Sequence, residues 1–257
     1  QSVVDVGFDV VDIGSFVSSK AIPQLSDTSK IIDSIDLSNS DSKLLVIVAN
    51  KKGALNASKY KKISYLGYPF SISETFQLRN TNKNINDSFN ELADIISVAK
   101  EVNKEVVVYL SMCFGNPYGD KWSIDIINYW VNKISKMGIK TISLSDTIGS
   151  STPESIKNIF SSLLENHKNI EFGAHLHSDS KTWHDKLDSA FKAGCRRFDG
   201  AIKGFGGCPL ASDQTVGNLP TEKIISYLNS QKSSNNIDLS RFEICLDKSQ
   251  AIFNEFN

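Results

Sequence analysis

Short continuous apolar runs alternate along this chain with longer segments in which apolar residues recur every three or four positions. Runs of the first kind are typical of strands buried on both faces of a parallel sheet. The second spacing is typical of amphipathic helices. Their alternation predicts repeated strand–helix units around a parallel sheet. The runs that we predict to be strands are Val10–Ile13, Leu44–Ala49, Ile63–Gly67, Val106–Leu110, Thr141–Leu144, Glu171–His175 and Arg197–Ile202.

Helices are predicted between and after these runs from apolar spacing and from residues that start or stop helices. Thr152 followed by Pro153 is a typical helix start, and Gly138 and Gly194 are typical helix stops. The helical segments that we predict are Ile85–Ala99, Ile124–Ile134, a helix opened by Thr152-Pro153, the segment Asp188–Ala193 as the end of another, Pro220–Leu228, and a closing helix at Ile237–Phe256.

The number of predicted strands points to a barrel with one strand outside the chain. The segment from Gln1 to Gly7 indicates the end of a helix stopped by glycine. We therefore predict an α/β fold, a TIM (β/α)8 barrel in which residues 1–257 form a single domain and the first strand precedes Gln1. The alternative is an open doubly wound sheet, which usually has fewer strands. It would also carry a glycine-rich phosphate loop after its first strand, and we find none.

Composition and charge are ordinary for a globular protein. The chain is 40% hydrophobic and 22% charged, with a formal net charge of −1, so no overall field draws it to nucleic acid or an anionic membrane. No apolar run approaches the ~20 residues that cross a bilayer. We therefore expect a cytoplasmic protein without nucleic-acid or membrane partners. The cysteines lack CxxC spacing, which predicts reduced, mostly buried thiols at Cys113, Cys195, Cys208 and Cys245.

Polar residues follow several of the predicted strands. In a (β/α)8 barrel the active site lies at the carboxyl ends of the strands, so these side chains are the candidates for chemistry. They are Asp12, Ser71, Ser73, Glu74, Tyr109, Ser111, Asp146, Thr147, His175, His177, Asp199 and the loop from Gly204 to Pro209.

The pair His175 and His177 is the sharpest of these local features. Residues two apart on a strand project from the same face, so both imidazoles can converge on one ion. Imidazole nitrogen is a good ligand for first-row divalent metals, and oxygen ligands can complete an octahedron. The alternative is one exposed histidine and one hydrogen-bonded histidine at a strand end.

Four further residues have a functional and a structural interpretation. Cys208 stands on a glycine-rich loop and is either a proton donor or nucleophile, or a small buried residue under a turn. Asn218 is either a metal ligand or a turn residue before the last marked helix. Asp12 and Asp146 are either structural hydrogen-bonding carboxylates or partners of a cation.

Eight short motifs occur in a fixed order: Gly14–Ser18, Pro23-Gln24, Ser73-Glu74-x-Phe76, Gly115-x-Pro117-Tyr118, Ser143-Leu144-x-Asp146-Thr147-Ile148-Gly149, Ala174-His175-x-His177, Gly204-x-Gly206-Gly207-Cys208-Pro209 and Gly217-Asn218-Leu219. With these motifs the chain resembles the 3-hydroxy-3-methylglutaryl-CoA lyase family of metal-dependent barrels. The resemblance runs from near Gln1 to about Leu228. The GxGGCP loop separates these lyases from the related isopropylmalate and homocitrate synthases.

The resemblance implies cleavage of 3-hydroxy-3-methylglutaryl-CoA to acetyl-CoA and acetoacetate, as in leucine degradation and ketone-body formation. It implies that His175, His177 and Asn218 bind Mg2+ or Mn2+. It also implies an acidic residue at Asp12, proton transfer by His175, and proton delivery by Cys208. We further expect an acyl-CoA thioester substrate, a homodimer or higher homo-oligomer, and substrate contacts from Tyr109, Ser143, Asp146, Thr147, Gly206 and Gly207.

Three departures from the family pattern accompany the resemblance. The family's remaining protein ligand is an aspartate in an Arg-Asp pair at the end of its first strand, and that pair is not in this chain. Ser178-Asp179 follows the histidines where the family often has Asp-Thr, and the spacing from Cys208 to Asn218 is one residue longer. Two alternatives follow: a condensing enzyme that uses acetyl-CoA and a keto acid, and an inactive barrel kept as a binding module.

Overall fold

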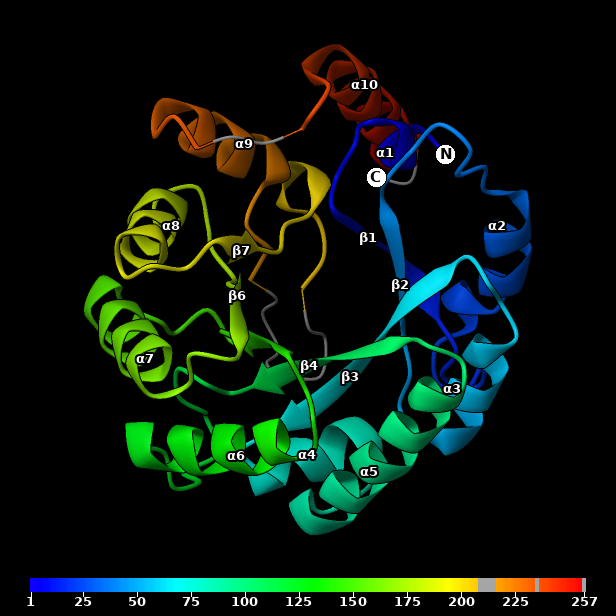
Figure 1. Ribbon diagram of the computed structural model, residues 1–257. Helices are drawn as coiled ribbons and strands as arrows, with labels where there is room; N and C mark the ends of the chain where they lie inside the picture. The colour runs from blue at the N-terminus through cyan, green and yellow to red at the C-terminus, as the bar shows by residue number, and fades with distance from the viewer. Residues whose placement is uncertain (208–215, 234–235, 256–257) are drawn as a thin grey trace.

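The computed structural model describes residues 1–207, 216–233 and 236–255, and in them seven parallel strands stand in chain order. Each strand pairs with the next one along the chain, which is the arrangement that strand–helix repeats produce. The strands curl into a partial barrel with the helices outside it, as Figure 1 shows. They are β1 (Val10–Ser15), β2 (Lys43–Ile47), β3 (Ile63–Ser71), β4 (Glu105–Ser111), β5 (Thr141–Ser145), β6 (Glu171–His175) and β7 (Arg197–Phe198).

The helices include every one that the sequence predicted and several that it did not. Those predicted are α5 (Ile85–Glu101), α6 (Ile124–Lys136), α7 (Pro153–Asn166), α8 (Trp183–Lys192), α9 (Thr221–Ser230) and α10 (Leu239–Glu255). The others are α1 (Ser2–Asp5), whose place at the start of the chain agrees with the predicted helix end, and α2 (Thr28–Ser34), α3 (Lys51–Ser58) and α4 (Glu74–Thr81). The last three have at most eight residues each, too few for a clear apolar period.

Side-chain caps explain where several helices begin. Thr152 accepts a hydrogen bond from the backbone of Ser155, and the Ser155 side chain accepts one from the backbone of Thr152, which forms a capping box before Pro153. Ser73 caps α4 in the same way by accepting from the backbone N–H of Phe76. The candidate Ser73 is therefore a capping residue in this fold.

The last strand is shorter than predicted. The sequence predicts a strand at Arg197–Ile202, but the structure has only Arg197–Phe198 in the sheet, followed by a 3-10 helix at Ile202–Gly204. The reason is a change of partner: the backbone N–H of Ala201 donates to Leu219 rather than to β6. The chain therefore turns away from the sheet directly after Asp199 and meets the segment that leads into α9.

The main core lies between the outer face of the strands and the helices. Phe70 of β3, Phe89 of α5 and Trp130 of α6 form an aromatic contact in it, with Phe70 and Trp130 ring centroids 5.1 Å apart. Cys113, Cys195 and Cys245 are buried and free, as predicted for these three. Among the helices of the described residues, none combines the length and the apolar character needed to cross a membrane.

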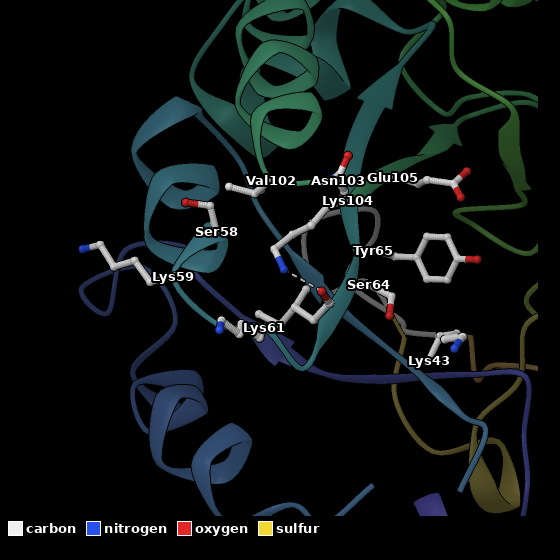
Figure 2. Close-up of a pocket in the computed structure, with 11 residues that line it drawn as sticks. Lys43, Ser58, Lys59, Lys61, Ser64, Tyr65, Val102, Asn103, Lys104 and Glu105 are labelled. Carbon is white, nitrogen blue, oxygen red and sulfur yellow. Dashed lines mark hydrogen bonds between the residues drawn. The ribbon is translucent and has the colours of Figure 1, made fainter.

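A cavity of about 530 Å³ opens at the amino ends of β2, β3 and β4, the end of the sheet opposite to the two histidines. Figure 2 shows lysines along its rim, with Lys104 donating to the carbonyl of Ile63. Conventional barrel active sites lie at the other end. The lining residues are Lys43, Ser58, Lys59, Lys61, Ile63, Ser64, Tyr65, Val102, Asn103, Lys104 and Glu105.

Candidate active site and metal centre

The two histidines lie together at the carboxyl end of β6, as the sequence predicts. His175 is the last residue of the strand, and His177 follows it after one residue. Their ring centroids are 5.6 Å apart. His175 is half-buried, whereas His177 is only 4% exposed, so the two rings share a location but differ in their contact with water.

His175 belongs to a network that faces the inside of the barrel. Its Nδ1 lies 3.2 Å from Oδ2 of Asp199, and the hydroxyl of Ser143 donates to the same oxygen at 2.5 Å. The ring of Tyr109 stands edge-on to His175 with centroids 5.5 Å apart. Burial alone would raise the pKa of Asp199, but the hydrogen bonds and the charge of His175 outweigh it and lower the pKa. Asp199 is therefore an ionised partner that orients the His175 ring.

His177 has a buried ring nitrogen that lacks a hydrogen-bond partner. Its Nδ1 is unsatisfied. Burial, followed by the charge of His175, lowers the pKa of His177 to about 4. The ring is therefore neutral at physiological pH, which is the form in which imidazole binds metals.

Asn218 lies directly beside His177, because the two residues form an antiparallel backbone bridge. The amide Nδ2 of Asn218 donates to the carbonyl of Phe205 at 3.0 Å. This fixes the amide so that its Oδ1 is the atom left to act as a ligand. Gly206 makes the approach possible, since a Cβ there would lie 2.9 Å from Nδ2 of Asn218. The glycine-rich loop thus packs closely against this side chain.

These three side chains fit a divalent cation. Ligating histidines usually donate their other ring N–H to a carboxylate or carbonyl, and the Asp199 contact gives His175 that arrangement and leaves its Nε2 as the ligand atom. His177 supplies the orphaned Nδ1, and Asn218 supplies an oriented amide oxygen. Across the described ranges no three His, Cys, Asp or Glu side chains gather as a ligand set, so the candidate site depends on this mixed group.

Asp12 of β1 belongs to the same electrostatic environment. Its neighbour Val11 packs into the core beneath the helices, so Asp12 faces the opposite side, toward the barrel interior. Asp12 keeps some contact with water. Partial desolvation by the surrounding protein, followed by the charge of Asp199, raises the pKa of Asp12 to about 7. An aspartate with this pKa can exchange a proton near neutral pH.

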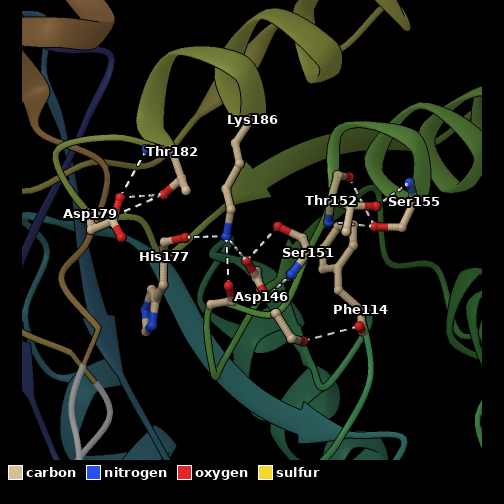
Figure 3. A network of polar contacts seen from close by, with 11 residues as sticks. Phe114, Asp146, Ser151, Thr152, Ser155, His177, Asp179, Thr182 and Lys186 are labelled. Atoms are coloured by element: carbon tan, nitrogen blue, oxygen red, sulfur yellow. Dashed lines mark hydrogen bonds and ion pairs between the residues drawn. The ribbon is translucent and has the colours of Figure 1, made fainter.

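Asp146 is engaged inside the protein rather than open to the site. Figure 3 shows its carboxylate bound to Lys186 and Ser151, and the Asp146 side chain has no exposed surface. Lys186 Nζ lies 2.8 Å from Oδ2 of Asp146 and also donates to the carbonyls of Gly149 and His177. The sequence predicts that Asp146 contacts substrate, and that stays a prediction; in this structure its carboxylate is buried and paired with Lys186 and Ser151.

The other predicted residues have mixed positions. Thr147 is buried and its hydroxyl accepts from the backbone N–H of Met112, which ties the ends of β4 and β5 together. Gly207, like Gly206, has positive φ, a conformation that favours glycine. The predicted proton donor Cys208 lies outside the described residues.

Two residues that contact the histidines in this structure, Asp199 and Lys186, were not assigned a role by sequence reasoning. Asp199 was visible as a polar residue in the last strand, but its partnership with His175 depends on a contact across 24 positions of sequence. Lys186 gave no signal in the sequence, because a lysine on a helix is expected to be exposed unless it has a buried partner. Its partner lies 40 residues away.

Comparisons with known proteins show which family this fold resembles. A hydroxymethylglutaryl-CoA lyase from Bacillus subtilis is 30% identical over 91% of this chain and 78% of its own length. The crystal structure of the Bacillus subtilis HMG-CoA lyase superposes with a TM-score of 0.91 at 27% identity, covering 98% of this chain and 85% of that one. An HMG-CoA lyase from Acinetobacter baumannii, solved with coenzyme A and 3-methylmalate, gives a TM-score of 0.85 at 30% identity, covering 93% and 77%.

The match to a family profile extends over nearly the whole chain. The profile described as HMGL-like covers residues 1–247. This range includes all seven strands and the three candidate ligands. The chain belongs to the HMGL-like family.

Proposed function

We propose that the protein is a metal-dependent carbon–carbon lyase that cleaves 3-hydroxy-3-methylglutaryl-CoA to acetyl-CoA and acetoacetate. The observation that carries the proposal is that His175, His177 and Asn218 lie together: the two imidazole centroids are 5.6 Å apart, and His177 forms a backbone bridge with Asn218. The named activity of relatives at about 30% identity supports it. The coenzyme A held by the Acinetobacter relative supports an acyl-CoA thioester as substrate.

The three ligand residues would hold Mg2+ or Mn2+, which bind oxygen and imidazole ligands. When bound, such an ion supplies Lewis-acid chemistry that lowers the pKa of the substrate's tertiary alcohol. His177 stays neutral because it is buried. Asn218 is held in orientation by Phe205, and His175 is oriented by Asp199.

The protein's own acids and bases account for the proton movements. Asp12, with a pKa of about 7, accepts and holds the proton of the substrate hydroxyl. His175 takes part in proton transfer only through its Nδ1 proton, which it shares with Asp199. The C2–C3 bond then breaks, acetoacetate leaves, and the electron pair remains on the acetyl-CoA fragment as an enolate. Cys208 donates the proton that quenches this enolate. General acid–base steps of this kind each contribute about 10²–10⁴-fold to the rate.

The direct test is to incubate the protein, expressed from its full coding sequence, with the CoA thioester and Mg2+ or Mn2+. We expect acetoacetate and acetyl-CoA in equal amounts. Cys208→Ala should lower turnover by about 10²–10⁴-fold while Mn2+ binding survives, whereas His177→Ala should weaken Mn2+ binding. Absence of acetoacetate would refute the proposal, and condensation of acetyl-CoA with 2-oxo acids in the same preparation would favour the condensing reaction.

The setting of the reaction is part of the proposal. We infer a cytoplasmic enzyme, like the relative from rat that is named cytoplasmic; others, such as the macaque relative, are named mitochondrial. We also infer a homodimer or higher homo-oligomer. Fractionation of source cells tests the first inference, and light scattering of the purified protein tests the second.

A further inference from the structure

The backbone that carries the two histidines is anchored at each successive carbonyl. The carbonyl of His177 differs from the others, because its donor is a side chain, that of Lys186 at 2.8 Å, rather than a backbone N–H. The three preceding carbonyls, those of Ala174, His175 and Leu176, accept hydrogen bonds from the backbone N–H groups of Asp199, Asp146 and Leu219, respectively.

The sheet cannot supply a donor to the His177 carbonyl. The pairing of β5 with β6 ends where Ser145 lies opposite His175. Beyond that point the chain leaves the sheet, and His177 bridges to Asn218 on its other side. A buried carbonyl requires a donor, and the ammonium of Lys186 takes the place of the missing strand.

The Lys186 ammonium has as many acceptors as it has hydrogens. It donates to Oδ2 of Asp146 and to the carbonyls of Gly149 and His177, each at 2.8 Å. Lys186 is 3% exposed and Asp146 is 1% exposed, so the pair is sealed from water. Ser151 fixes the carboxylate from its other side through its backbone N–H and its hydroxyl. The group therefore has one geometry, which Figure 3 displays.

Stability alone is a poor reason for such a pair. Replacing a buried ion pair by well-packed apolar residues is often neutral or stabilising, because both charges lose their hydration. Geometric specificity is the gain that an ion pair can offer instead. Here the ion pair fixes the backbone of His177, because Lys186 donates to its carbonyl. The imidazole of His177 has an orphaned Nδ1 and points away from Lys186 in Figure 3.

We propose that Lys186 is a positioning residue for the metal centre: its ammonium, neutralised by Asp146, holds the His177 backbone so that Nδ1 stays aimed at the cation. The inference rests on the proposed metal-dependent function. Asp146 acts on both histidines, since its backbone N–H also holds the His175 carbonyl. Ligating groups must be held to within about 0.5 Å to bind well. The Lys186–Asp146 pair supplies that restraint at His177, where the strand has ended.

The test is Mn2+ affinity, measured by titration calorimetry without substrate. The informative variant is Lys186→Met combined with Asp146→Asn, which removes both charges while the amide keeps Ser151 partnered. We expect Mn2+ binding about 10–100-fold weaker than in the wild type, the usual cost of losing an outer contact to a ligand. Lys192→Met is the matched control, because Lys192 lies on the same helix in an exposed ion pair with Asp188; its affinity should be unchanged.

A second control separates positioning from general weakening of the fold. Leu92→Ala removes a fully buried side chain of α5 and lowers stability without touching the site. If its Mn2+ affinity falls as far as that of the double variant, Lys186 acts only through stability and the inference is wrong. Mn2+ affinity of the double variant within threefold of the wild type also overturns it.

The outcomes distinguish this inference from the proposed function. Wild-type protein that shows no Mn2+ binding sensitive to His177→Ala would refute the metal-dependent function itself. Wild-type binding that depends on His177 but not on Lys186 would refute only the inference. If the double variant does not fold, Lys186→Met combined with Asp146→Leu takes its place under the same threefold criterion, because it also removes the donor to the His177 carbonyl and replaces the buried pair by apolar side chains.

Discussion

His175 and His177 are two residues apart at the end of one strand, yet they differ in exposure and in the groups that hold them. His175 is half-buried and held through its side chain by Asp199. His177 is buried and held through its backbone by the ammonium of Lys186. One ring is coupled to a charge and remains near water, whereas the other is neutral and fixed. The first arrangement suits a group that also moves protons, and the second suits a group that only binds.

The two carboxylates of these networks differ in the same way. Asp199 lies beside an imidazole and a hydroxyl, and its side chain is 21% exposed. Asp146 lies beside an ammonium and has no exposed side-chain surface. Because an unpaired charge costs far more when it is sealed from water, substitution of Asp146 alone should lower the free energy of unfolding strongly, in addition to any effect on Mn2+ binding. Damage to the Asp199 network should appear in activity.

Removal of one member of the sealed pair should give the largest effect on stability. Asp146→Ala leaves the Lys186 ammonium buried and unpaired, so we expect the free energy of unfolding to fall by about 3–5 kcal/mol. Urea unfolding measures it. Lys192→Ala breaks an exposed pair on the same helix and should cost about 0–1 kcal/mol. Equal losses of unfolding free energy in the two variants would contradict the contrast between the buried ion pair and the exposed one.

Replacement of Asp199 should mainly affect activity and metal binding. Asp199→Asn keeps the shape of the side chain but removes the charge that orients His175, and outer partners of metal ligands are worth about 10–100-fold. We expect lyase turnover or Mn2+ affinity to fall by that factor, with a smaller loss of stability than Asp146→Ala. Ser143→Ala, which removes only a hydrogen bond to Asp199, should give a smaller decrease. A stability loss as large as that of Asp146→Ala would contradict the comparison.

The sequence predicted one of these two networks better than the other. Strand periodicity placed His175 and His177 on one face, and strand order placed Asp199 in the neighbouring strand. Local pattern and topology were therefore enough to mark the members of the His175–Asp199 network, but not the contact between them. The sealed network depends on Lys186 reaching carbonyls of two other segments, and main-chain carbonyls leave no trace in a residue pattern. The early end of β7 was missed for a related reason, since Ala201 finds its partner in the segment before α9.

Substitution of Gly206, in the glycine-rich loop that packs against Asn218, should have a smaller effect than the substitutions above. Gly206 has a φ of 99°, and a Cβ there would lie 2.9 Å from Nδ2 of Asn218. Gly206→Ala should therefore cost about 1–2 kcal/mol of backbone strain and also shift the amide, weakening Mn2+ binding. Gly119→Ala is the matched control, since Gly119 has a φ of 76° with open space around its Cβ. Both variants should lose stability, but a loss of Mn2+ affinity in both would show that the Asn218 contact is irrelevant.

A carboxylate held by hydrogen bonds alone should give the smallest effect. Asp120 accepts from the hydroxyls of Ser73 and Thr75 and from the Thr75 backbone, and the Ser73 hydrogen bond is the main reason that its pKa is lowered. A lowered pKa stabilises the fold above the ordinary aspartate pKa of about 3.9, and this stabilisation is lost as the pH falls through the folded value. We expect Asp120→Asn to cost about 1 kcal/mol at pH 7.

The pH dependence distinguishes this carboxylate from the sealed one. The gap in unfolding free energy between wild type and Asp120→Asn, measured by urea unfolding, should close as the pH falls below about 4 and through the lowered pKa of Asp120, because both side chains are then uncharged. A gap that stays constant over this range would mean that the charge of Asp120 contributes nothing. Asp146→Asn should behave differently: its cost should be larger at neutral pH, because it removes the countercharge of a buried ammonium rather than the acceptor of neutral hydroxyl and backbone donors.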